Sequence, residues 1–447
     1  MESEIKVFSY PNGEIQRVQL VRFESWSELT FLRLHGADNA LGCFADIYRK
    51  YLVPACPWLF GNMVMFRLPE DVSVPFPEGD GPWGDVAERL TAAAILLRKD
   101  VRFPGGKPVF HSHKAEALYR ELEKRDCLRL VRGKLPVTTP IPVKDVCGYL
   151  TKKDRDARLK VNASFFIMDR FDCATVYDHV GTPLGLCVKD GVITNPPLFD
   201  REALLVGMDG TVRIESPRVE ELSLEIRGKV YRHGVNARVY SRPQRSRTPR
   251  GSDKKLVIIG CRVAAVHTGA SAPIPASGFV LTVPRESWVQ PGDAVIYRGM
   301  ENVRFGIQVG NSIVRNGEKT LSFRSRFYNI RHLQPVPFPP SLYPMNFDKA
   351  RAARIALGAD REGKPMLLWA EGAGKNRYTP GEDSCGASLK EMADICSSIG
   401  MINAVNLDGG GSAQILLRGQ RALKISDRKE EDNSEAERPI PLALMVP

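Results

Sequence analysis

The sequence predicts an α+β protein in which a mixed, partly helical N-terminal domain precedes a β-rich antiparallel domain. Two observations support this fold class. Amphipathic helical patterns occur in the first 140 residues and in one segment near the end, whereas short apolar runs separated by turns fill the region between them. The segment 132–145 contains three prolines and separates the two patterns. We therefore expect an accessory domain over residues 1–140 and a second domain over residues 141–447.

Two segments of the expected accessory domain have the periodicity of amphipathic helices. In residues 83–100, Val86, Leu90 and Leu97 recur at a spacing that places them on one helical face. Residues 113–126 form the second candidate helix. The composition of these segments indicates no specific role, so the sequence leaves the function of the accessory domain open.

Three expected hairpins distinguish the second domain. Each consists of two apolar runs joined by Asp-Gly or Asn-Gly, dipeptides that accept the positive φ of a tight turn. The hairpins lie at residues 184–194, 204–215 and 312–323. No fixed repeat period relates them, which favours an antiparallel sheet domain over a solenoid.

One helix is expected near the end of the chain. Ser388 and Glu391 have the spacing of a capping box, and Gly400 suits the left-handed position that follows a helix. Leu389 and Met392 begin an apolar face between these two ends. The helix is therefore expected to pack against the sheet of the second domain.

The composition argues against several classes of protein. No window approaches the roughly 20 uninterrupted apolar residues that a membrane-spanning helix needs, and the first residues lack the pattern of a secretion signal. The nine cysteines are odd in number and form no CxxC pair, which argues against a disulfide framework and a thiolate zinc site. We therefore expect free thiols in a reducing compartment, a cytoplasmic location and no membrane partner.

The net charge of +11 comes from 63 basic and 52 acidic residues and is unevenly distributed. Residues 226–255 contain ten basic residues and one acid, Asp253, for a local charge of +9. Residues 241–255 have no apolar periodicity, so we expect an exposed loop between two strands, either merely solvated or binding a phosphate-bearing ligand or nucleic acid. Nucleic acid is disfavoured, because Tyr231 and Tyr240 are the only aromatic residues among the cations.

The segment from Asn406 to Ser412 is the leading candidate for a functional site. Asp408 is followed by three glycines, which is more than a hairpin turn requires. Consecutive glycines let the backbone approach a ligand and turn N–H groups toward an anion. We expect a strand after this segment, and no Lys follows the glycines, so the pattern differs from a phosphate loop that opens a helix. A flexible or bulged turn is the alternative.

This segment and four others, in the same order, resemble the phosphodiester glycosidase family. Together they cover roughly residues 155–447. The five segments are VNASFF at 161–166 with the hairpin after it, VNARVYSRP at 235–243, RIALGADREGKPMLLWAEG at 354–372, NLDGGGS at 406–412 and ERPIPLALMV at 437–446. The resemblance treats Asn236 as part of a strand and Arg438 as part of the closing strand.

The resemblance implies a compact α+β domain that hydrolyses the bond between the anomeric carbon of a sugar and a phosphodiester oxygen. A phosphate monoester is a good leaving group, so its departure needs little protonation. Catalysis then depends on positioning, on stabilising the phosphate charge and on guiding water to an oxocarbenium-like centre. Arginines, backbone amides and one or two carboxylates suit this task.

The resemblance also implies the residues of the site. Asp408 is the leading carboxylate, as a base toward water or as a clamp on sugar hydroxyls, and Glu371 is the second catalytic candidate. The candidate substrate-binding and phosphate-binding residues are Arg354, Arg438, Gly409, Gly410, Gly411, Ser412, Asn162, Asn236 and Asn406. The structural alternatives are ion pairs for the arginines, a hairpin-end carboxylate for Glu371 and a turn contact for Asn162.

Some residues depart from the pattern of the family. Ala163 and Ser164 stand where the family has two glycines, Ile355 stands where it has Thr, and Glu371 replaces an Asp. Side chains therefore occupy space where the family brings bare backbone near the sugar, which implies a reshaped pocket. A non-catalytic binder of phosphorylated glycan or exopolysaccharide is the alternative function.

The expected partner of the site is an anionic sugar phosphodiester, and no cofactor is expected. A divalent cation such as Ca²⁺ is the alternative, with Asp360 and Glu362 as ligands, although both residues also suit a hairpin turn. His111 and His113 alternate as on a strand edge, but no third metal ligand accompanies them. The basic segment from Arg238 to Lys255 would flank the site and attract the anionic substrate.

Overall fold

The structure is a computed structural model and describes most of the chain outside the region from 35 to 146. It describes residues 1–34, 61–66, 72–74, 93, 96–97, 100–102, 107–133, 147–320 and 350–447, except 153, 155, 169–174, 176, 178–180, 199–200, 243–244, 309, 311, 375–377 and 430. The chain divides into two compact units, Met1–His35 with Cys147–Pro447, and Gly36–Val146.

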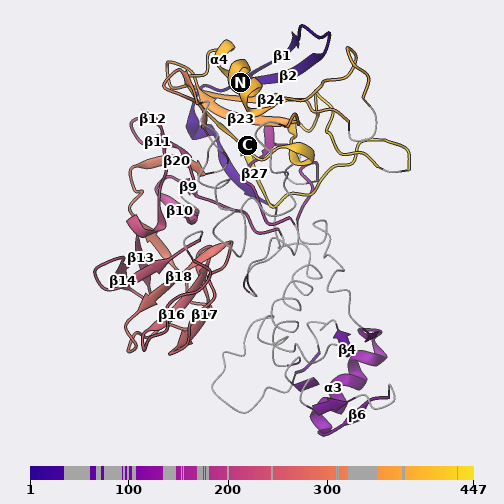
Figure 1. Ribbon diagram of the computed structural model, residues 1–447, viewed down its shortest axis with the longest axis vertical. Helices are drawn as coiled ribbons and strands as arrows, with labels where there is room; N and C mark the ends of the chain where they lie inside the picture. The colour runs from indigo at the N-terminus through magenta and orange to yellow at the C-terminus, as the bar shows by residue number, and fades with distance from the viewer. Residues whose placement is uncertain are drawn as a thin grey trace. The chain divides into compact units, whose positions relative to one another are not determined.

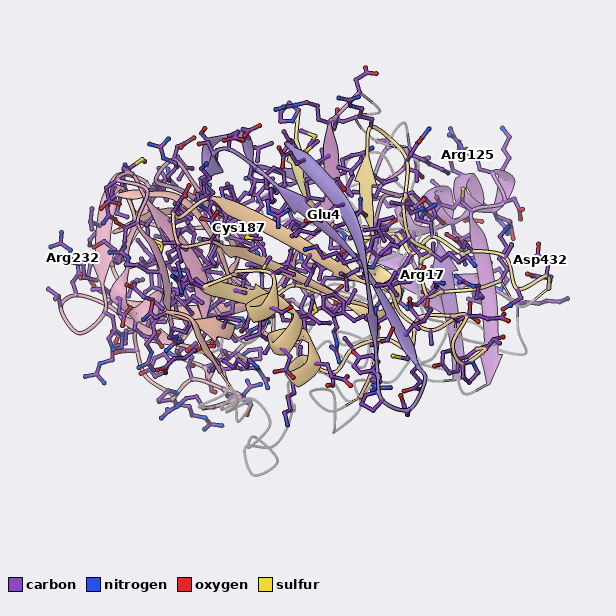
Figure 2. The ribbon with its side chains drawn as sticks, turned by 90° about the horizontal axis from the view of Figure 1, so that it is seen from above. Glu4, Arg17, Arg125, Cys187, Arg232 and Asp432 are labelled. Atoms are coloured by element: carbon purple, nitrogen blue, oxygen red, sulfur yellow. The ribbon has the colours of Figure 1, made fainter. Side chains whose placement is uncertain are left out.

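The larger unit begins at the N-terminus. Strands β1 (Glu2–Ser9) and β2 (Ile15–Arg22) form a hairpin, and β2 also pairs with a strand from residues 365–370. These residues were expected in the accessory domain. They lie instead in the larger unit, because β2 pairs with the strand at residues 365–370 and thereby adds the hairpin to the sheet of that unit. Figure 2 shows Glu4 and Arg17 on this hairpin.

The larger unit contains a seven-stranded antiparallel sheet, of which β1, β2, β23 and β24 are labelled in Figure 1. Each strand of this sheet pairs with its neighbour in antiparallel orientation. In spatial order the strands are β1, β2, β24 (Pro365–Ala370), β23 (Arg354–Ala359), β25 (Asn403–Asn406), β21 (Ser312–Arg315) and β22 (Glu318–Lys319).

The central strands of this sheet are buried on both faces. In β23, Ile355 and Leu357 pack in one hydrophobic core, while Ala356 between them packs in another. In β24, Trp369 belongs to the first core and Leu368 to the second. Successive side chains of a strand point to opposite faces, so covering both faces requires a continuous apolar run instead of alternation.

Helix α4 (Leu389–Ser398) covers one face of the sheet and contacts β21, β22 and β23. Its N-cap is Ser388, whose side chain and that of Glu391 form the expected capping box. The other face packs in a core shared with a four-stranded sheet. That sheet has the order β26 (Ile415–Leu417), β8 (Leu159–Asn162), β27 (Leu442–Val446) and β3 (Thr30–Arg33).

Three further antiparallel sheets complete the described part of the larger unit, and a second hydrophobic core links them. The first has β10 (Val192–Asn195), β9 (Cys187–Lys189), β20 (Val303–Gln308), β11 (Ala203–Gly207) and β12 (Val212–Glu215). The second has β14 (Lys229–Arg232), β13 (Ser223–Ile226) and β19 (Ile296–Arg298). The third has β15 (Arg238–Tyr240), β18 (Gly278–Val283), β16 (Lys254–Ile259) and β17 (Arg262–Thr268).

The three expected hairpins are confirmed as β9–β10, β11–β12 and β21–β22. In the first, Asp190 and Gly191 have φ of 47° and 77°, the pair of positive angles that a two-residue turn requires. The described part of the larger unit is thus β-rich and antiparallel, as predicted.

The smaller unit contains the strand pairs β4 (Gly61–Phe66) with β7 (Leu128–Gly133) and β5 (Val101–Arg102) with β6 (Val109–Phe110). Helix α3 (His113–Lys124) confirms the second candidate helix, and the Ser112 side chain caps it. His113 is therefore helical and does not continue a strand edge with His111. Most of the expected helix at 83–100 lies outside the described residues. No helix in the described ranges is long and apolar enough to cross a membrane.

Candidate functional site

The glycine-rich segment lies between two sheets of the larger unit. Strand β25 carries Asn406 at the end of the seven-stranded sheet, and β26 begins in the four-stranded sheet at Ile415. A 3-10 turn over Gly410–Ser412 forms within the segment, and the next element is strand β26, as expected. We call residues 408–412 the glycine loop. The glycine loop is therefore anchored at one end by β25 of the seven-stranded sheet and at the other by β26 of the four-stranded sheet.

The backbone of Asp408 is held by strand β8 and the residue after it. Its amide donates to the carbonyl of Ala163 at 3.1 Å, and its carbonyl accepts from Asn162 Nδ2 at 2.7 Å. The side chain is 4% exposed, and Oδ1 accepts from the amide of Gly409 at 2.9 Å. Oδ2 makes no hydrogen bond of good geometry with any described residue. One carboxylate oxygen is therefore fixed, and the other is available to a ligand.

The environment of Asp408 changes its acidity. Burial raises the pKa of the carboxyl from 3.8 to about 6, because the charged form loses its hydration. The Ser412 hydroxyl acts in the opposite direction, as do the positive charges of Arg438 and Arg354 and the Gly409 amide, but these contributions only partly offset the effect of burial. The group therefore exchanges a proton close to neutral pH, which suits an acid or base.

Asn162 holds the glycine loop in place. Besides donating to Asp408, its amide oxygen accepts from the backbone amide of Gln414 at 3.0 Å. The side chain is 1% exposed, and both of its polar atoms are used by the protein. The contacts therefore support the structural alternative, in which Asn162 ties the turn together. They do not support direct binding of the substrate by Asn162.

The three glycines meet different surroundings. A Cβ at Gly409 would lie 2.7 Å from the carbonyl oxygen of Ala353, and one at Gly411 would lie 2.2 Å from Asp427 Oδ2 and 2.4 Å from Arg438 Nη2. Real Cβ atoms do not approach so closely. Gly410 has open space around it but a φ of 60°, in the left-handed region. Close packing thus explains why positions 409 and 411 are glycine, and the left-handed backbone conformation explains why position 410 is glycine.

Most amides of the glycine loop have partners within the protein. The amide of Gly409 donates to Asp408, that of Gly410 donates to Ala353 at 2.8 Å, and that of Ser412 donates to Gly409 at 3.2 Å. The expectation that Gly409, Gly410 and Ser412 turn their amides toward an anion is therefore not met. These amides instead donate to acceptors within the protein that hold the turn. The hydroxyl of Ser412 is fully buried and has no hydrogen bond of good geometry with a described residue.

Arg354 is the first residue of β23 and is 1% exposed. Its Nε donates to the carbonyl of Ala387 at 3.1 Å, and its Nη2 donates to that of Ala350 at 2.8 Å. The aliphatic part of the side chain runs past the glycine loop, since a Cβ at Gly409 would lie 3.6 Å from Arg354 Cδ. The surface ion pair considered for this residue is wrong, because Arg354 is a buried cation beside Asp408.

Arg438 forms an ion pair with Asp427, a residue that sequence reasoning missed. Arg438 Nη2 lies 2.7 Å from Asp427 Oδ2, and each side chain is 25% exposed. Arg438 precedes β27 and is not part of the closing strand as expected. Only the long-range contact reveals Asp427, since its segment carries several acids with no pattern to single one out.

Glu371 directly follows β24 and is 5% exposed. Its Oε2 accepts from the Ser384 hydroxyl and lies 3.6 Å from Arg17 Nη1, while its Oε1 accepts from the amide of Lys424 at 2.8 Å. Both carboxylate oxygens are therefore engaged by the protein. These contacts join four distant segments and support a positioning role for Glu371 instead of the expected catalytic one.

Several buried polar atoms in and near the glycine loop make no hydrogen bond of good geometry with a described residue. Asn406 is 0% exposed, yet neither Oδ1 nor Nδ2 makes a hydrogen bond with a described residue. The same holds for the hydroxyl of Ser164, which follows β8. Asp408 Oδ2 and the Ser412 hydroxyl also lack a hydrogen bond of good geometry among the described residues, although the hydroxyl lowers the pKa of Asp408. Buried polar atoms of this kind are commonly satisfied by a ligand or water. Sequence reasoning found Asn406, but it treated Ser164 only as a departure from the family.

Asn236 stands apart from this group. It lies in the exposed turn between β14 and β15, where its Oδ1 accepts from the amide of Arg232 at 2.8 Å and its Nδ2 donates to the carbonyl of Val230 at 2.9 Å. The strands on either side pack in the second core, whereas residues of the glycine loop's flanks pack in the first. Asn236 is therefore a turn residue, and the expected role in substrate binding is corrected.

The hairpin between β23 and β24 explains Asp360 without a metal. Its Oδ1 accepts from the amides of Glu362 and Lys364, both at 2.9 Å. Within the described ranges no group of three or more His, Cys, Asp or Glu side chains could hold a metal ion.

Comparison with known proteins addresses the family. Residues 233–447 match the family described as phosphodiester glycosidase. This confirms the resemblance to the phosphodiester glycosidases. The matched residues include Arg354, Glu371, the glycine loop and Arg438, whereas Asn162 and Ser164 lie outside them.

Curated relatives of the mouse and human are both named N-acetylglucosamine-1-phosphodiester alpha-N-acetylglucosaminidase. The mouse protein is 35% identical over 100 residues, which are 22% of this chain and 18% of the relative. The human protein is 35% identical over 95 residues, which are 21% of this chain and 17% of the relative. The alignments therefore span less than a fifth of the length of each relative.

Three solved structures show a more distant likeness. A hypothetical protein from Synechocystis has a TM-score of 0.43 at 14% identity, with 100% of this chain and 62% of that chain covered. The zebrafish N-acetylglucosamine-1-phosphodiester alpha-N-acetylglucosaminidase catalytic domain, auto-inhibited by its pro-peptide, has a TM-score of 0.39 at 12% identity, covering 100% and 82%. A putative exported protein from Burkholderia pseudomallei has a TM-score of 0.43 at 15% identity, covering 100% and 97%.

Proposed function

We propose that the protein hydrolyses the glycosidic bond of a sugar-1-phosphodiester at the glycine loop, releasing a sugar and a phosphomonoester. The observation that carries this proposal is the buried carboxyl of Asp408, which has a pKa of about 6 and one oxygen that makes no hydrogen bond of good geometry among the described residues. A carboxyl whose pKa is shifted by burial and nearby charges is typical of functional sites.

Asp408 would act on the water that attacks the anomeric carbon. Above pH 6 its carboxylate is ionised, and Oδ2 accepts a proton from water while the carbon–oxygen bond to phosphate breaks. The hydrogen bond from Gly409 to Oδ1 fixes the orientation of the carboxylate. The leaving phosphomonoester carries its own negative charge away and needs no strong acid, which agrees with a site that has one available carboxylate instead of two.

The phosphate charge would be stabilised by Arg438 and Arg354. Arg438 is a quarter exposed and shares its charge with Asp427, so it can rearrange toward a phosphate oxygen at modest cost. Arg354 is buried and anchored to backbone carbonyls, so it contributes a fixed positive potential instead of a mobile contact.

A panel of sugar-1-phosphodiesters, assayed with and without chelator, tests the proposal. We expect turnover of at least one substrate, and we expect Asp408→Asn to lower kcat about 100-fold to 10,000-fold while circular dichroism shows an intact fold. Asp432→Asn is the matched control, since Asp432 is exposed. A folded Asp408→Asn variant with full activity would contradict the assignment.

A second candidate function is non-catalytic binding of a phosphorylated glycan. It is favoured by Ala163 and Ser164, whose side chains stand where the family has bare backbone. Both residues are buried, and Ala163 also accepts the hydrogen bond from the Asp408 amide. Saturable binding of phosphodiester sugars by calorimetry, with no product from any of them, would favour this second function over hydrolysis.

A further inference from the structure

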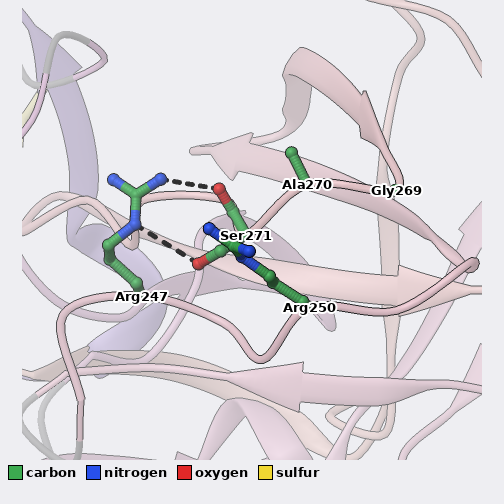
Figure 3. Close-up of a pocket in the computed structure, with 5 residues that line it drawn as sticks. All are labelled: Arg247, Arg250, Gly269, Ala270 and Ser271. Carbon is green, nitrogen blue, oxygen red and sulfur yellow. Dashed lines mark hydrogen bonds between the residues drawn. The ribbon is translucent and has the colours of Figure 1, made fainter.

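A basic recess lies in the part of the larger unit that contains β16 and β17. It has a volume of about 450 Å³ and is lined by Arg247, Arg250, Gly269, Ala270 and Ser271 (Figure 3). Arg247 Nη2 donates to the carbonyl of Ser271 at 2.6 Å, and its Nε donates to the Ser271 hydroxyl at 3.3 Å. These two bonds hold the guanidinium of Arg247 at the wall of the recess.

The positive charge of the recess has no acidic counterpart among the described residues. Neither Arg247 nor Arg250 forms an ion pair with any acid in the described ranges, whereas Arg315 and Arg351 elsewhere pair with glutamates. Arg247 Nη1 and the whole guanidinium of Arg250 also make no hydrogen bond with a described residue. Nearby, Arg245 stacks on the ring of Tyr240 at 5.5 Å and likewise lacks an acidic partner among those residues.

Two other cations of the same loop serve the fold. Arg242 is 6% exposed and donates from Nε to the carbonyl of Ile274 at 2.8 Å. Lys255 is 2% exposed, and its Nζ donates to the carbonyls of Gly251 and Asp253. The expected exposed loop between two strands lies between β15 and β16, but close packing against residues 272–274 buries part of it. Arg247 and Arg250, which line the recess, keep donors without a partner among the described residues.

We propose that this recess is a second anion site, which binds the phosphate group of a phosphorylated small molecule. Two arginines provide forked donors suited to a tetrahedral oxyanion. The volume falls within the range of roughly 300–1,000 Å³ for small-molecule sites and exceeds what a bare phosphate needs. Gly269 has a φ of 74° and open space beyond its α-carbon, so the wall offers room for the rest of a ligand.

A nucleic acid fits these observations less well. Single-stranded nucleic acids bind along extended grooves that combine cations with several stacking aromatic residues. Here two arginines line one open recess, and Tyr240 already stacks with Arg245. The site does not involve Asp408, so its tests are independent of the proposed hydrolysis.

Protection of arginines from phenylglyoxal, measured by peptide mass spectrometry on the full chain, tests the site. The probes are inorganic phosphate and glucose 6-phosphate, with sodium chloride at equal ionic strength as the blank. At a probe concentration of about ten times the Kd, modification of Arg250 should slow about tenfold by mass action. Arg361, an exposed arginine in the β23–β24 turn without an acidic partner among the described residues, serves as the control and should react at an unchanged rate.

The outcomes distinguish the alternatives. Protection by either phosphate probe supports the anion site, and stronger protection by glucose 6-phosphate indicates that the recess also contacts the sugar. Equal rates for Arg250 with and without both probes would overturn the proposal. Stronger protection by a single-stranded oligonucleotide than by glucose 6-phosphate would also overturn it, in favour of nucleic-acid binding.

Variants provide a second test. Arg250→Gln combined with Arg247→Gln should weaken binding of glucose 6-phosphate in calorimetry at least tenfold, whereas Arg361→Gln should leave it unchanged. Asp408→Asn should retain this binding even if it abolishes hydrolysis, which separates the two proposals. Unchanged affinity in the folded double variant would contradict the assignment of the recess.

Discussion

Arg438 and Asp427 form an ion pair against which the glycine loop packs. Arg438 donates to Asp427 Oδ2 from Nε at 2.9 Å and from Nη2 at 2.7 Å. A Cβ on Gly411 would lie within 2.4 Å of both side chains. The third glycine of the loop and this ion pair therefore occupy adjoining space, and one cannot gain a side chain unless the other moves.

The Gly411→Ala variant should separate packing from turn geometry. We expect a loss of roughly 1–3 kcal/mol in the free energy of unfolding, because the methyl group displaces the Asp427–Arg438 pair, and a marked loss of activity. Gly410→Ala is the matched control, since its Cβ meets nothing within 4 Å and it incurs only the cost of a left-handed φ, about 1–2 kcal/mol. Urea unfolding and kcat/KM measure both effects. Equal activity of the two variants would contradict this account.

The Glu371→Gln variant should distinguish a positioning residue from a catalytic acid. The amide cannot accept hydrogen bonds at both ends, so either Ser384 or the Lys424 amide loses its acceptor and unfolding becomes easier by roughly 1.5–3 kcal/mol. Activity should fall while the pH profile of kcat/KM keeps its shape. Disappearance of one limb of that profile would show that Glu371 itself transfers a proton. Glu362→Gln, in an exposed turn, is the control.

The raised pKa of Asp408 makes stability depend on pH. Unfolded Asp ionises near pH 3.8 and the folded group near 6, so between these values the folded state binds the extra proton. The free energy of unfolding should therefore fall as pH rises from about 4 to about 6, by up to about 3 kcal/mol. Asp408→Asn lacks this titration, so its melting temperature relative to the unmodified protein should increase over the same interval. A difference that is constant with pH would contradict the buried, high-pKa carboxyl.

Local patterns predicted the elements that local interactions determine. The capping box of α4 and the turn at Asp190 depend on residues within a few positions of each other, and both were found from the sequence. The glycine loop was found because three successive glycines are more than a hairpin turn requires. Asp427 and the partners of Glu371 were not predictable, because chain folding brings them together from segments that carry no shared pattern. The N-terminal hairpin was placed in the wrong unit for the same reason.

His267 should report occupancy of the basic recess. Its Nε2 lies 2.7 Å from the Tyr177 hydroxyl, and its pKa is lowered by burial and by the positive charges of Arg247 and Lys255. The ring is therefore neutral near pH 7. A phosphate in the recess opposes the charge of Arg247, so the pKa of His267 should rise toward its ordinary value of 6.5. Titration of the ring resonances by NMR, with and without glucose 6-phosphate, measures this shift.

The same linkage predicts an effect on stability. Because the folded pKa of His267 lies below the unfolded one, the unfolded state takes up the proton first and stability decreases as pH falls through 6.5. Bound phosphate should reduce that decrease. Arg247→Gln should raise the pKa of His267 without phosphate and should remove the response to it, since the charge that links the two groups is gone. A phosphate-dependent shift of equal size in Arg247→Gln would show that the anion acts on His267 from another site.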